Sequence, residues 1–325
     1  MGRLRVYVTR EIPKEGIDML EKECEVEVYE KDHPVPADVL TEKIRSCDGI
    51  LPLVTDKIDA KVLDAAKNLK GIANYAVGYD NIDVKEATKR GIPVSNTPGV
   101  LTDATAETAW ALLFASARRI VEADSEIRGG RWKGWGPLQF LGADIAGKTL
   151  GIVGAGRIGT AMALKSSGFN MRVLYYDAEP NETLEKELGA KKTDFPTLLG
   201  ESDFISVHVP LIEETHHLFT LETFKQMKKS AHFINTSRGP IVKEADLLTA
   251  LEEKHIAGAG IDVYEFEPEV TKGLERLSNV TITPHIGSAT YGSRTGMATT
   301  AAQNLLAMLR GEEAPNCVNP EVYSQ

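Results

Sequence analysis

The chain has 325 residues, of which 42% are hydrophobic and 26% are charged, and its formal net charge is −10. This length exceeds what one hydrophobic core normally supports, so we expect two domains. The acidic balance argues against nucleic acid and anionic membrane surfaces as partners, because both attract surfaces rich in Lys and Arg.

The distribution of cysteines and apolar residues predicts a cytosolic protein. Cys24, Cys47 and Cys317 are far apart and odd in number, which is typical of reduced thiols in a reducing compartment. The first residues lead directly into a strand, without the apolar run of a signal peptide. No stretch approaches the ~20 apolar residues that a membrane span needs.

Short strands alternate with short helices from the beginning of the chain. Strands are predicted at 5–9, 26–29, 49–53, 71–75 and 92–94, and helices at 14–22, 37–46, 60–67 and 84–90. This alternation is typical of a parallel sheet with helices on both faces. We expect these residues to form an α/β domain of their own.

A turn-rich stretch, 95–102, ends this first domain, and one long helix is predicted over 103–128. Its many alanines favour close packing, while Trp110, Leu113 and Phe114 supply apolar bulk. We interpret it as a helix between domains or between subunits.

A dinucleotide-binding fingerprint follows. A short apolar strand runs into Gly154, Gly156 and Gly159, and a helix-compatible segment comes next. The first glycine permits a sharp turn, the second lets a pyrophosphate approach the backbone, and the third lets helix and strand pack closely. The opening turn of the helix, with Arg157 and Ile158, offers free N–H groups to the phosphates.

The next predicted strand, 171–176, ends at Asp177, which lies 18 residues past Gly159 and close to the expected spacing of about 20. A carboxylate there accepts hydrogen bonds from both ribose hydroxyls of an adenosine and repels a 2′-phosphate. The cofactor is therefore predicted to be NAD rather than NADP. The alternative is an ordinary Gly-rich turn followed by a surface aspartate.

The alternation resumes after the fingerprint, with strands predicted at 204–207, 232–235, 257–261 and 280–283 and a last helix at 293–310. The apolar face of that helix is expected to return to the N-terminal domain. Together these patterns predict an α/β protein with two doubly wound parallel sheets.

Three charged residues lie just past three successive predicted strands: Arg238, Glu267 and His285. The carboxyl ends of parallel strands share one edge of a sheet, where ligands bind. Arg238 is suited to hold a carboxylate by two points. His285 is suited to exchange a proton near neutral pH, and Glu267 beside it favours the imidazolium and fixes the tautomer. The set suits hydride transfer between a 2-oxo acid and a 2-hydroxy acid.

Each of these residues also has an ordinary interpretation, as a solvated turn arginine, a loop histidine or a turn glutamate. Among the other histidines, His208 precedes Pro210 at a strand end and is interpreted as lining the adenine pocket. His216 and His217 are interpreted as a surface pair, because no third ligand accompanies them. No metal site is predicted.

With these residues in hand, the chain resembles the D-isomer-specific 2-hydroxyacid dehydrogenases, and within them the glyoxylate/hydroxypyruvate reductase branch. The resemblance covers essentially the whole chain. It is carried by NYAVGYDNID (74–83), GIPVSNTPG (91–99), GKTLGIVGAGRIG (147–159), NTSRGP (235–240), GAGIDVYEFEP (258–268) and TPHIGSAT (283–290).

The resemblance implies a flavodoxin-like substrate domain, 1–98 plus 289–325, and a Rossmann NAD-binding domain, 99–288. It implies that Arg238, Glu267 and His285 are catalytic. Further implied cofactor contacts come from Thr105, Thr236, Asp262 and Gly287, and implied substrate contacts from Leu53, Val77, Gly78 and Trp135.

The tryptophan of this branch acts in the active site of the neighbouring subunit, so the resemblance also implies a homodimer. Trp132 is the alternative to Trp135, and both could instead pack at the dimer interface. Two departures stand out: Lys243 replaces an acidic residue of many relatives, and Glu267 replaces the amide of formate-oxidising relatives.

We therefore predict an NAD-dependent homodimeric reductase of a small 2-oxo acid, glyoxylate or hydroxypyruvate. Two alternatives remain within the same chemistry, 3-phosphoglycerate dehydrogenase and D-lactate dehydrogenase. A dinucleotide-sensing corepressor on the same scaffold is a third, because it would keep the catalytic residues.

Overall fold

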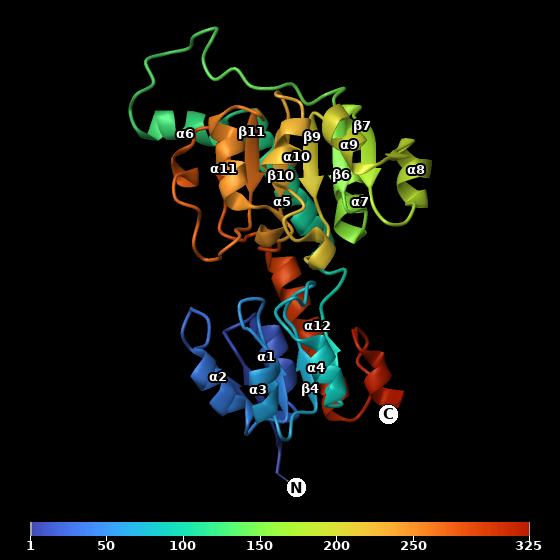
Figure 1. The fold of residues 1–325 in the computed structure, drawn as a ribbon. Helices are drawn as coiled ribbons and strands as arrows, with labels where there is room; N and C mark the ends of the chain where they lie inside the picture. Colours follow the sequence, from blue (N-terminus) through green and yellow to red (C-terminus); the bar gives the residue numbers. More distant parts are fainter. Residues whose placement is uncertain (1, 325) are drawn as a thin grey trace. The chain divides into compact units, whose positions relative to one another are not determined.

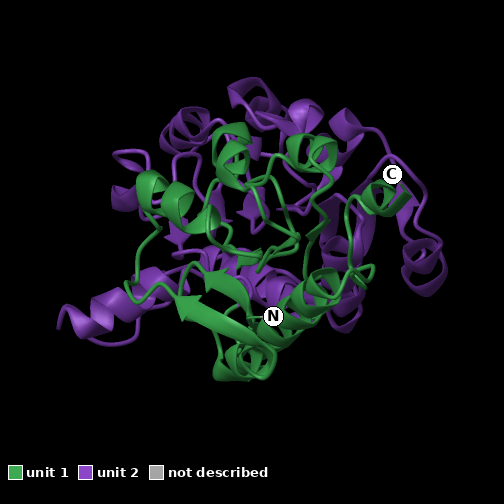
Figure 2. Cartoon of the chain, turned by 90° about the horizontal axis from the view of Figure 1, so that it is seen from below, with its two compact units in different colours: residues 1–101, 289–325 green, residues 102–288 purple. Residues whose placement is uncertain are grey.

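The computed structural model describes residues 2–324, which divide into two compact units, coloured separately in Figure 2. Unit 1 contains the chain up to Leu101 and from Ala289 onward, and unit 2 runs from Thr102 to Ser288. None of the helices in the described residues has the length and apolarity needed to cross a membrane.

Unit 1 is built on a five-stranded parallel sheet (Figure 1). Its strands are β1 (Leu4–Val8), β2 (Cys24–Val28), β3 (Gly49–Leu51), β4 (Gly71–Ala73) and β5 (Val94–Ser95). They lie in the order β2-β1-β3-β4-β5, which is the flavodoxin-like order. The direction of winding therefore reverses between β1 and β3, where ligands bind in sheets of this kind.

The helices of unit 1 are α1 (Lys14–Glu21), α2 (Ala37–Ile44), α3 (Ala60–Ala65), α4 (Val84–Lys89) and the C-terminal α12 (Tyr291–Leu309). Helix α12 packs on α1, β3 and β4, so the two ends of the chain share this unit. The hydroxyl of Tyr75 donates to the carbonyl of Arg294 at 2.7 Å, and Asn304 donates to the carbonyl of Asn96 at 3.0 Å.

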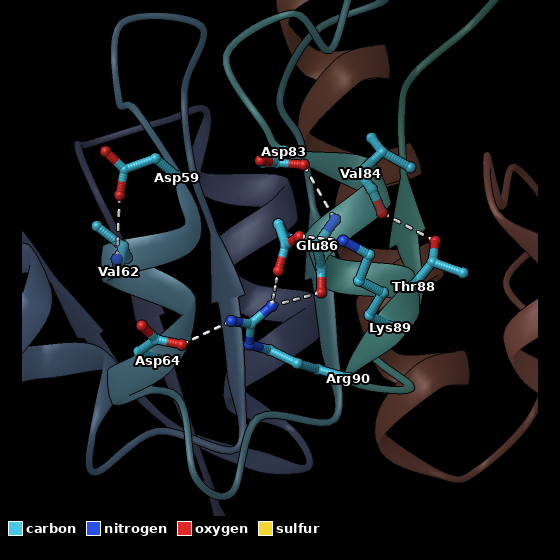
Figure 3. Close-up of polar contacts among 9 residues, drawn as sticks. All are labelled: Asp59, Val62, Asp64, Asp83, Val84, Glu86, Thr88, Lys89 and Arg90. Atoms are coloured by element: carbon cyan, nitrogen blue, oxygen red, sulfur yellow. Dashed lines mark hydrogen bonds and ion pairs between the residues drawn. The ribbon is translucent and has the colours of Figure 1, made fainter.

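Local capping defines the starts of α3 and α4 (Figure 3). Asp59 and Asp83 precede these helices, and each accepts a hydrogen bond from the backbone N–H three residues later, at 3.1 and 3.0 Å. The guanidinium of Arg90 contacts Glu86 on α4 and Asp64 on α3. This ion pair links neighbouring helices, although solvent exposure makes such pairs weak.

Unit 2 contains a seven-stranded parallel sheet, β12-β11-β10-β9-β6-β7-β8. The strands are β6 (Thr149–Val153), β7 (Arg172–Tyr176), β8 (Lys191–Lys192), β9 (Phe204–Val207), β10 (His232–Asn235), β11 (Gly258–Ile261) and β12 (Val280–Ile282). The winding reverses at β6, with β7 and β8 on one side of it and β9 to β12 on the other, as in a Rossmann sheet. The two sheets confirm the predicted fold class; the two-residue, lysine-only β8 was not predicted.

Helices cover both faces of this sheet. They are α5 (Thr102–Ala117), α6 (Ile120–Arg128), α7 (Arg157–Leu164), α8 (Glu182–Leu188), α9 (Phe195–Glu201), α10 (Leu221–Gln226) and α11 (Glu244–Glu252), with 3₁₀ turns η1 (Lys165–Phe169), η2 (Glu213–Thr215), η3 (Gly239–Ile241) and η4 (Leu274–Arg276); a further turn, η5 (Pro320–Ser324), lies in unit 1. Ile152 and Tyr175 face α5, α7 and α8, whereas Val153 and Phe233 face α9, α10 and α11. This alternation along buried strands gives the unit a core on each side.

The single long helix predicted over 103–128 is wrong. The helix ends at Ala117, and Arg119 takes a left-handed conformation with φ 53° before α6 begins. The carbonyl of Ala117 accepts a hydrogen bond from the N–H of Ala143, at 2.8 Å, so a distant segment satisfies the end of α5. The helical periodicity of the sequence gives no information about this contact between distant segments.

Candidate active site

The glycine loop that follows β6 has the shape of a phosphate cradle. Gly154 has φ 94°, and a Cβ on it would lie 2.6 Å from the backbone nitrogen of Val209. A Cβ on Gly159 would lie 1.9 Å from the carbonyl oxygen of Gly154, so α7 packs directly on the loop. By contrast, beyond its own chain neighbours and helix backbone, no described atom lies within 4 Å of the Cβ position of Gly156.

Helix α7 begins at Arg157 and Ile158, and Gly156 before it provides no side-chain cap. The first N–H groups of such a helix point outward and favour anions. The loop and helix therefore fit the pyrophosphate of a dinucleotide.

Asp177 lies at the end of β7, against the glycine loop. Its Oδ2 accepts a hydrogen bond from the N–H of Ala155 at 2.6 Å. Asn181 donates to the carbonyl of Ala155 and to Thr160, both at 2.8 Å. These contacts hold the loop from two sides. Asn181 was missed in the sequence analysis, although an asparagine before a helix is a recognisable start signal.

His208 and Pro210 follow β9 on the other side of the loop. The carbonyl carbon of His208 would lie 2.7 Å from a Cβ on Gly154, so the two backbones are in contact. The ring Nε2 lies 2.9 Å from the hydroxyl of Ser206. Burial lowers the pKa of His208 to about 3, so the ring is neutral in the folded protein.

The structure brings His285 and Glu267 together. The ring Nδ1 lies 3.0 Å from Oε2 of Glu267, and the other carboxylate oxygen accepts the N–H of Tyr264 at 3.0 Å. Burial opposes the ionisation of Glu267, but the hydrogen bond and charge of His285 act against it, and the pKa of Glu267 stays below its usual value. The N–H of Tyr264 and the nearby charge of Arg238 act in the same direction.

Arg238 follows β10 and precedes Gly239, whose backbone lies directly on the Glu267 loop. A Cβ on Gly239 would lie 1.8 Å from the carbonyl oxygen of Tyr264. Only glycine permits this approach, which places the arginine loop beside the glutamate loop. All three predicted catalytic residues therefore lie at the carboxyl edge of one sheet, within unit 2.

His285 itself adopts a left-handed conformation, with φ 54°, that asparagine or glycine would adopt more readily. Asp262 holds it there. The fully buried carboxylate accepts the N–H groups of Ile286 and Gly287 at 2.8 and 2.7 Å and the hydroxyl of Thr283 at 2.6 Å. Strain of this kind persists at functional sites when surrounding contacts enforce it.

Two buried threonines lie on α5 and directly after β10. Thr236 directly follows β10, and its buried hydroxyl has no hydrogen-bond partner among the described residues. Thr105, also buried, lies 3.5 Å from the Cβ position of Gly287. A buried polar atom without a partner is unusual and is consistent with a ligand that supplies one. These residues fit the nicotinamide end of a dinucleotide.

In unit 1, three of the four predicted substrate contacts follow the carboxyl ends of β3 and β4: Leu53, Val77 and Gly78. The amide of Asn81 donates to the carbonyl of Leu53 at 3.1 Å, and Asn74 donates to the carbonyl of Gly78 at 2.8 Å. The two asparagines also bond each other at 3.1 Å. Both lie in the NYAVGYDNID block but were not singled out as functional.

Trp132 and Trp135 lie in the extended segment after α6, and they are 51% and 84% exposed. Helix α6 has no buried residue at all. We name the exposed apolar side chains of this region the arm patch: Ile120, Val121, Ile127, Trp132, Trp135, Leu138 and Leu141. Figure 1 shows α6 and the long loop that follows it extending beyond the sheet of unit 2.

The chain is similar to known proteins over nearly its whole length. Residues 110–287 match the model of the D-isomer specific 2-hydroxyacid dehydrogenase NAD-binding domain. The chain is 54% identical to a glyoxylate reductase of Thermococcus litoralis over 98% of both chains. It is 52% identical to a glyoxylate reductase of Korarchaeum cryptofilum, over 98% of this chain and 96% of the relative.

Solved structures give the same result. A protein of Thermus thermophilus superposes with a TM-score of 0.91 at 45% identity, over 97% of this chain and all of the other. An NADPH-dependent glyoxylate/hydroxypyruvate reductase of Sinorhizobium meliloti, in complex with NADP and malonate, superposes with a TM-score of 0.86 at 33% identity, over 98% of both chains.

Proposed function

The chain belongs to the D-isomer-specific 2-hydroxyacid dehydrogenase family, and from this premise we propose that it is an NAD-dependent reductase of glyoxylate or hydroxypyruvate. The observation that carries the proposal is the hydrogen-bonded pair of His285 and Glu267 beside Arg238, on the same sheet edge as the glycine loop. Relatives named glyoxylate reductase, at about half identity over nearly the whole chain, support the choice of substrate.

In this reaction the bound dinucleotide supplies the hydride, and the chain holds and protonates the oxo acid. Arg238 binds the substrate carboxylate and draws electron density from the adjacent carbonyl. Glu267 occupies Nδ1 of His285, which leaves Nε2 as the atom that donates a proton to the carbonyl oxygen. In the oxidation direction, Nε2 takes the proton back.

The cofactor would be held by residues already described in unit 2. The backbone of Gly156, Arg157 and Ile158 would bind the pyrophosphate, and His208 with Pro210 would line the adenine side. Thr105, Thr236, Asp262 and Gly287 would lie at the nicotinamide end. In unit 1, Leu53 and the backbone of Val77 and Gly78 would contact the substrate. Unit 2 would thus be the cofactor domain and unit 1 the substrate domain.

A turnover assay tests this function. Purified protein is offered NADH with glyoxylate, hydroxypyruvate, pyruvate and 3-phosphohydroxypyruvate, and the loss of NADH is followed. We expect glyoxylate or hydroxypyruvate to have the highest kcat/KM, and His285→Ala to lose about 10²- to 10⁴-fold in kcat, as removal of a general acid and base implies. Wild-type turnover in His285→Ala, or no turnover of any oxo acid, would contradict the proposal.

Preference for NAD over NADP rests on Asp177, whose carboxylate lies beside the glycine loop and would repel a 2′-phosphate. Asp177→Asn removes the charge but keeps an acceptor for the N–H of Ala155. We expect this variant to lower KM for NADPH and raise KM for NADH. Glu187→Gln, at an exposed acid of α8, is the charge-matched control. A wild type that prefers NADPH would refute this assignment.

The protein is further proposed to be a homodimer that associates through the arm patch. Seven large apolar side chains are exposed within residues 120–141, and a monomer rarely exposes so much apolar surface in one region. We expect a dimer in analytical ultracentrifugation, and a monomer for the double variant Leu138→Asp/Leu141→Asp. A monomeric wild type would end this proposal.

Trp135 is proposed to act in the active site of the neighbouring protomer, with Trp132 as the alternative. If Trp135 acts in this way, His285→Ala and Trp135→Ala are each nearly inactive alone. Mixing these two variants tests the proposed role of Trp135. A mixed dimer contains one site with an intact His285 and a neighbouring Trp135, so activity should exceed that of either parent. Full activity of Trp135→Ala alone would exclude this tryptophan.

A further inference from the structure

A buried carboxylate binds the loop that carries Glu267 without belonging to the acid–base pair. Glu244 is the first residue of α11, and it is only 3% exposed. Burying a charged carboxylate is unfavourable unless hydrogen bonds compensate. Its hydrogen bonds therefore indicate what this residue holds in place.

Glu244 joins the two ends of one loop. Its Oε2 accepts the N–H of Glu265 at 2.8 Å, and its Oε1 accepts the N–H of Thr271 at 2.5 Å. In return, the N–H of Glu244 donates to Oε2 of Glu265 at 2.9 Å. The loop that these contacts close, residues 265–271, carries Glu267.

The same loop is bound to the arginine loop. The second carboxylate oxygen of Glu265 lies 2.6 Å from Nε2 of His217. The N–H of His217 donates to the carbonyl of Pro240 at 2.9 Å, two residues past Arg238. Glu244 and Glu265 therefore connect α11, the glutamate loop and the arginine loop through hydrogen bonds that all lie within unit 2.

We propose that Glu244 is a positioning residue of the acid–base pair: by holding both ends of the 265–271 loop, it keeps Glu267 within hydrogen-bond distance of His285. This inference rests on the proposed function. Glu244 contacts neither substrate nor cofactor in this role, and it acts through Glu267. Loss of one of the two hydrogen bonds to Glu244 would let the 265–271 loop move. A shift of about 1 Å is enough to weaken a catalytic contact severely.

A merely structural role for Glu244 is the alternative, since a carboxylate in the first turn stabilises a helix through the helix dipole. Asp246 on the same helix provides a matched control, because it faces the neighbouring helix α10. Helices α10 and α11 pack together (Figure 1). Its Oδ2 accepts the N–H of Leu221 at 2.9 Å, which ties α11 to α10 rather than to the glutamate loop. Asp246→Asn therefore perturbs α11 without releasing Glu267.

A double-mutant cycle on the full chain tests the inference, with glyoxylate and NADH as substrates. We compare the wild type, Glu244→Gln, Glu267→Gln and the double variant. Glutamine keeps the shape of Glu244 but presents an amide NH₂ to one of the two backbone donors. We expect Glu244→Gln to lower kcat about 10-fold with KM for NADH within about 2-fold, and Asp246→Asn to leave kcat within about 2-fold.

The diagnostic quantity is the coupling. If Glu244 acts through Glu267, adding Glu244→Gln to Glu267→Gln lowers kcat by less than about 2-fold further, because the contact it protects is already lost. Additive losses, a wild-type kcat in Glu244→Gln, or an equal kcat loss in Asp246→Asn would each overturn the inference. A wild-type kcat in Glu267→Gln would instead show that Glu267 does not act on His285. That result would refute the acid–base assignment of the proposed function and, with it, this inference.

Removal of a buried charge can also prevent folding, so circular dichroism accompanies every measurement. If Glu244→Gln does not fold, the cycle is run with Glu244→Asp, which keeps the charge but shortens the side chain by one methylene. The same expectations and the same refuting outcomes apply to it.

Discussion

The contact between Glu267 and His285 makes the strongest prediction. Glu267→Gln keeps the size of the side chain and an oxygen that accepts the N–H of Tyr264, but it removes the charge facing Nδ1 of His285. The amide can also donate to Nδ1, which leaves the proton on Nε2. The neutral ring then cannot act as a base at Nε2.

The distance sets the size of the effect. At the 3.0 Å between Nδ1 and Oε2, two unit charges attract by about 1.4 kcal/mol in bulk water and about 5.5 kcal/mol at an effective dielectric constant of about 20. Both side chains are about one-third exposed, so we take an interaction energy near the lower limit, about 2 kcal/mol. A loss of this energy in the transition state corresponds to about a 30-fold lower rate. The wrong tautomer adds to this, as in the aspartate-to-asparagine change of serine protease triads, where the loss is about 10⁴-fold.

We therefore expect kcat to fall by about 10²- to 10⁴-fold in both directions, because the neutral ring neither accepts a proton at Nε2 nor releases one there without becoming an anion. Initial rates in both directions measure this, with saturating cofactor and with a thermal unfolding curve to verify the fold. KM for NADH should hardly change, because Glu267 faces the histidine. If kcat stayed within about 3-fold of wild type in both directions, Glu267 would not act on His285 and the reasoning would fail.

Three further predictions follow from the same structure. Arg238→Lys should lower kcat/KM for the oxo acid by at least about 10²-fold, because the point charge of lysine does not replace the two parallel hydrogen bonds of a guanidinium. KM for NADH should stay near the wild-type value. Steady-state kinetics with varied oxo acid measure the loss in kcat/KM. Asp262→Asn should lower kcat and destabilise the protein by about 1–3 kcal/mol, because one backbone N–H that donates to the carboxylate would face an amide NH₂. Urea unfolding and initial rates measure these two effects. Wild-type stability together with a wild-type kcat would contradict this prediction. Burial lowers the pKa of His232 from 6.5 to about 4, so the unfolded chain binds the additional proton between these values, and stability falls as the pH drops from 6.5 to 4, by about 3 kcal/mol at most. Urea midpoints at pH 7 and pH 5 measure this loss, and His232→Gln should reduce the difference between them; an equal pH dependence in wild type and variant would refute the assignment.

Much of the fold follows from local sequence patterns. Apolar strands of four or five residues, separated by amphipathic helices, predict parallel sheets, and β9 and β10 have the predicted bounds. The glycine fingerprint and Asp177 predict the dinucleotide site. Arg238, Glu267 and His285 could be placed at one edge of a sheet before any coordinates, because parallel strands all end on the same side.

The tertiary structure decided the contacts between segments that lie far apart in the chain. The end of α5 at Ala117 depends on the N–H of Ala143, and the hold of Glu244 on Thr271 spans a separation of 27 residues. Likewise, the amide of Asn81 selects the carbonyl of Leu53 because folding brings two strand ends together. Periodicity reports which face of an element is apolar, but hydrogen bonds between loops depend on register and distance, and these arise only when the whole sheet has formed.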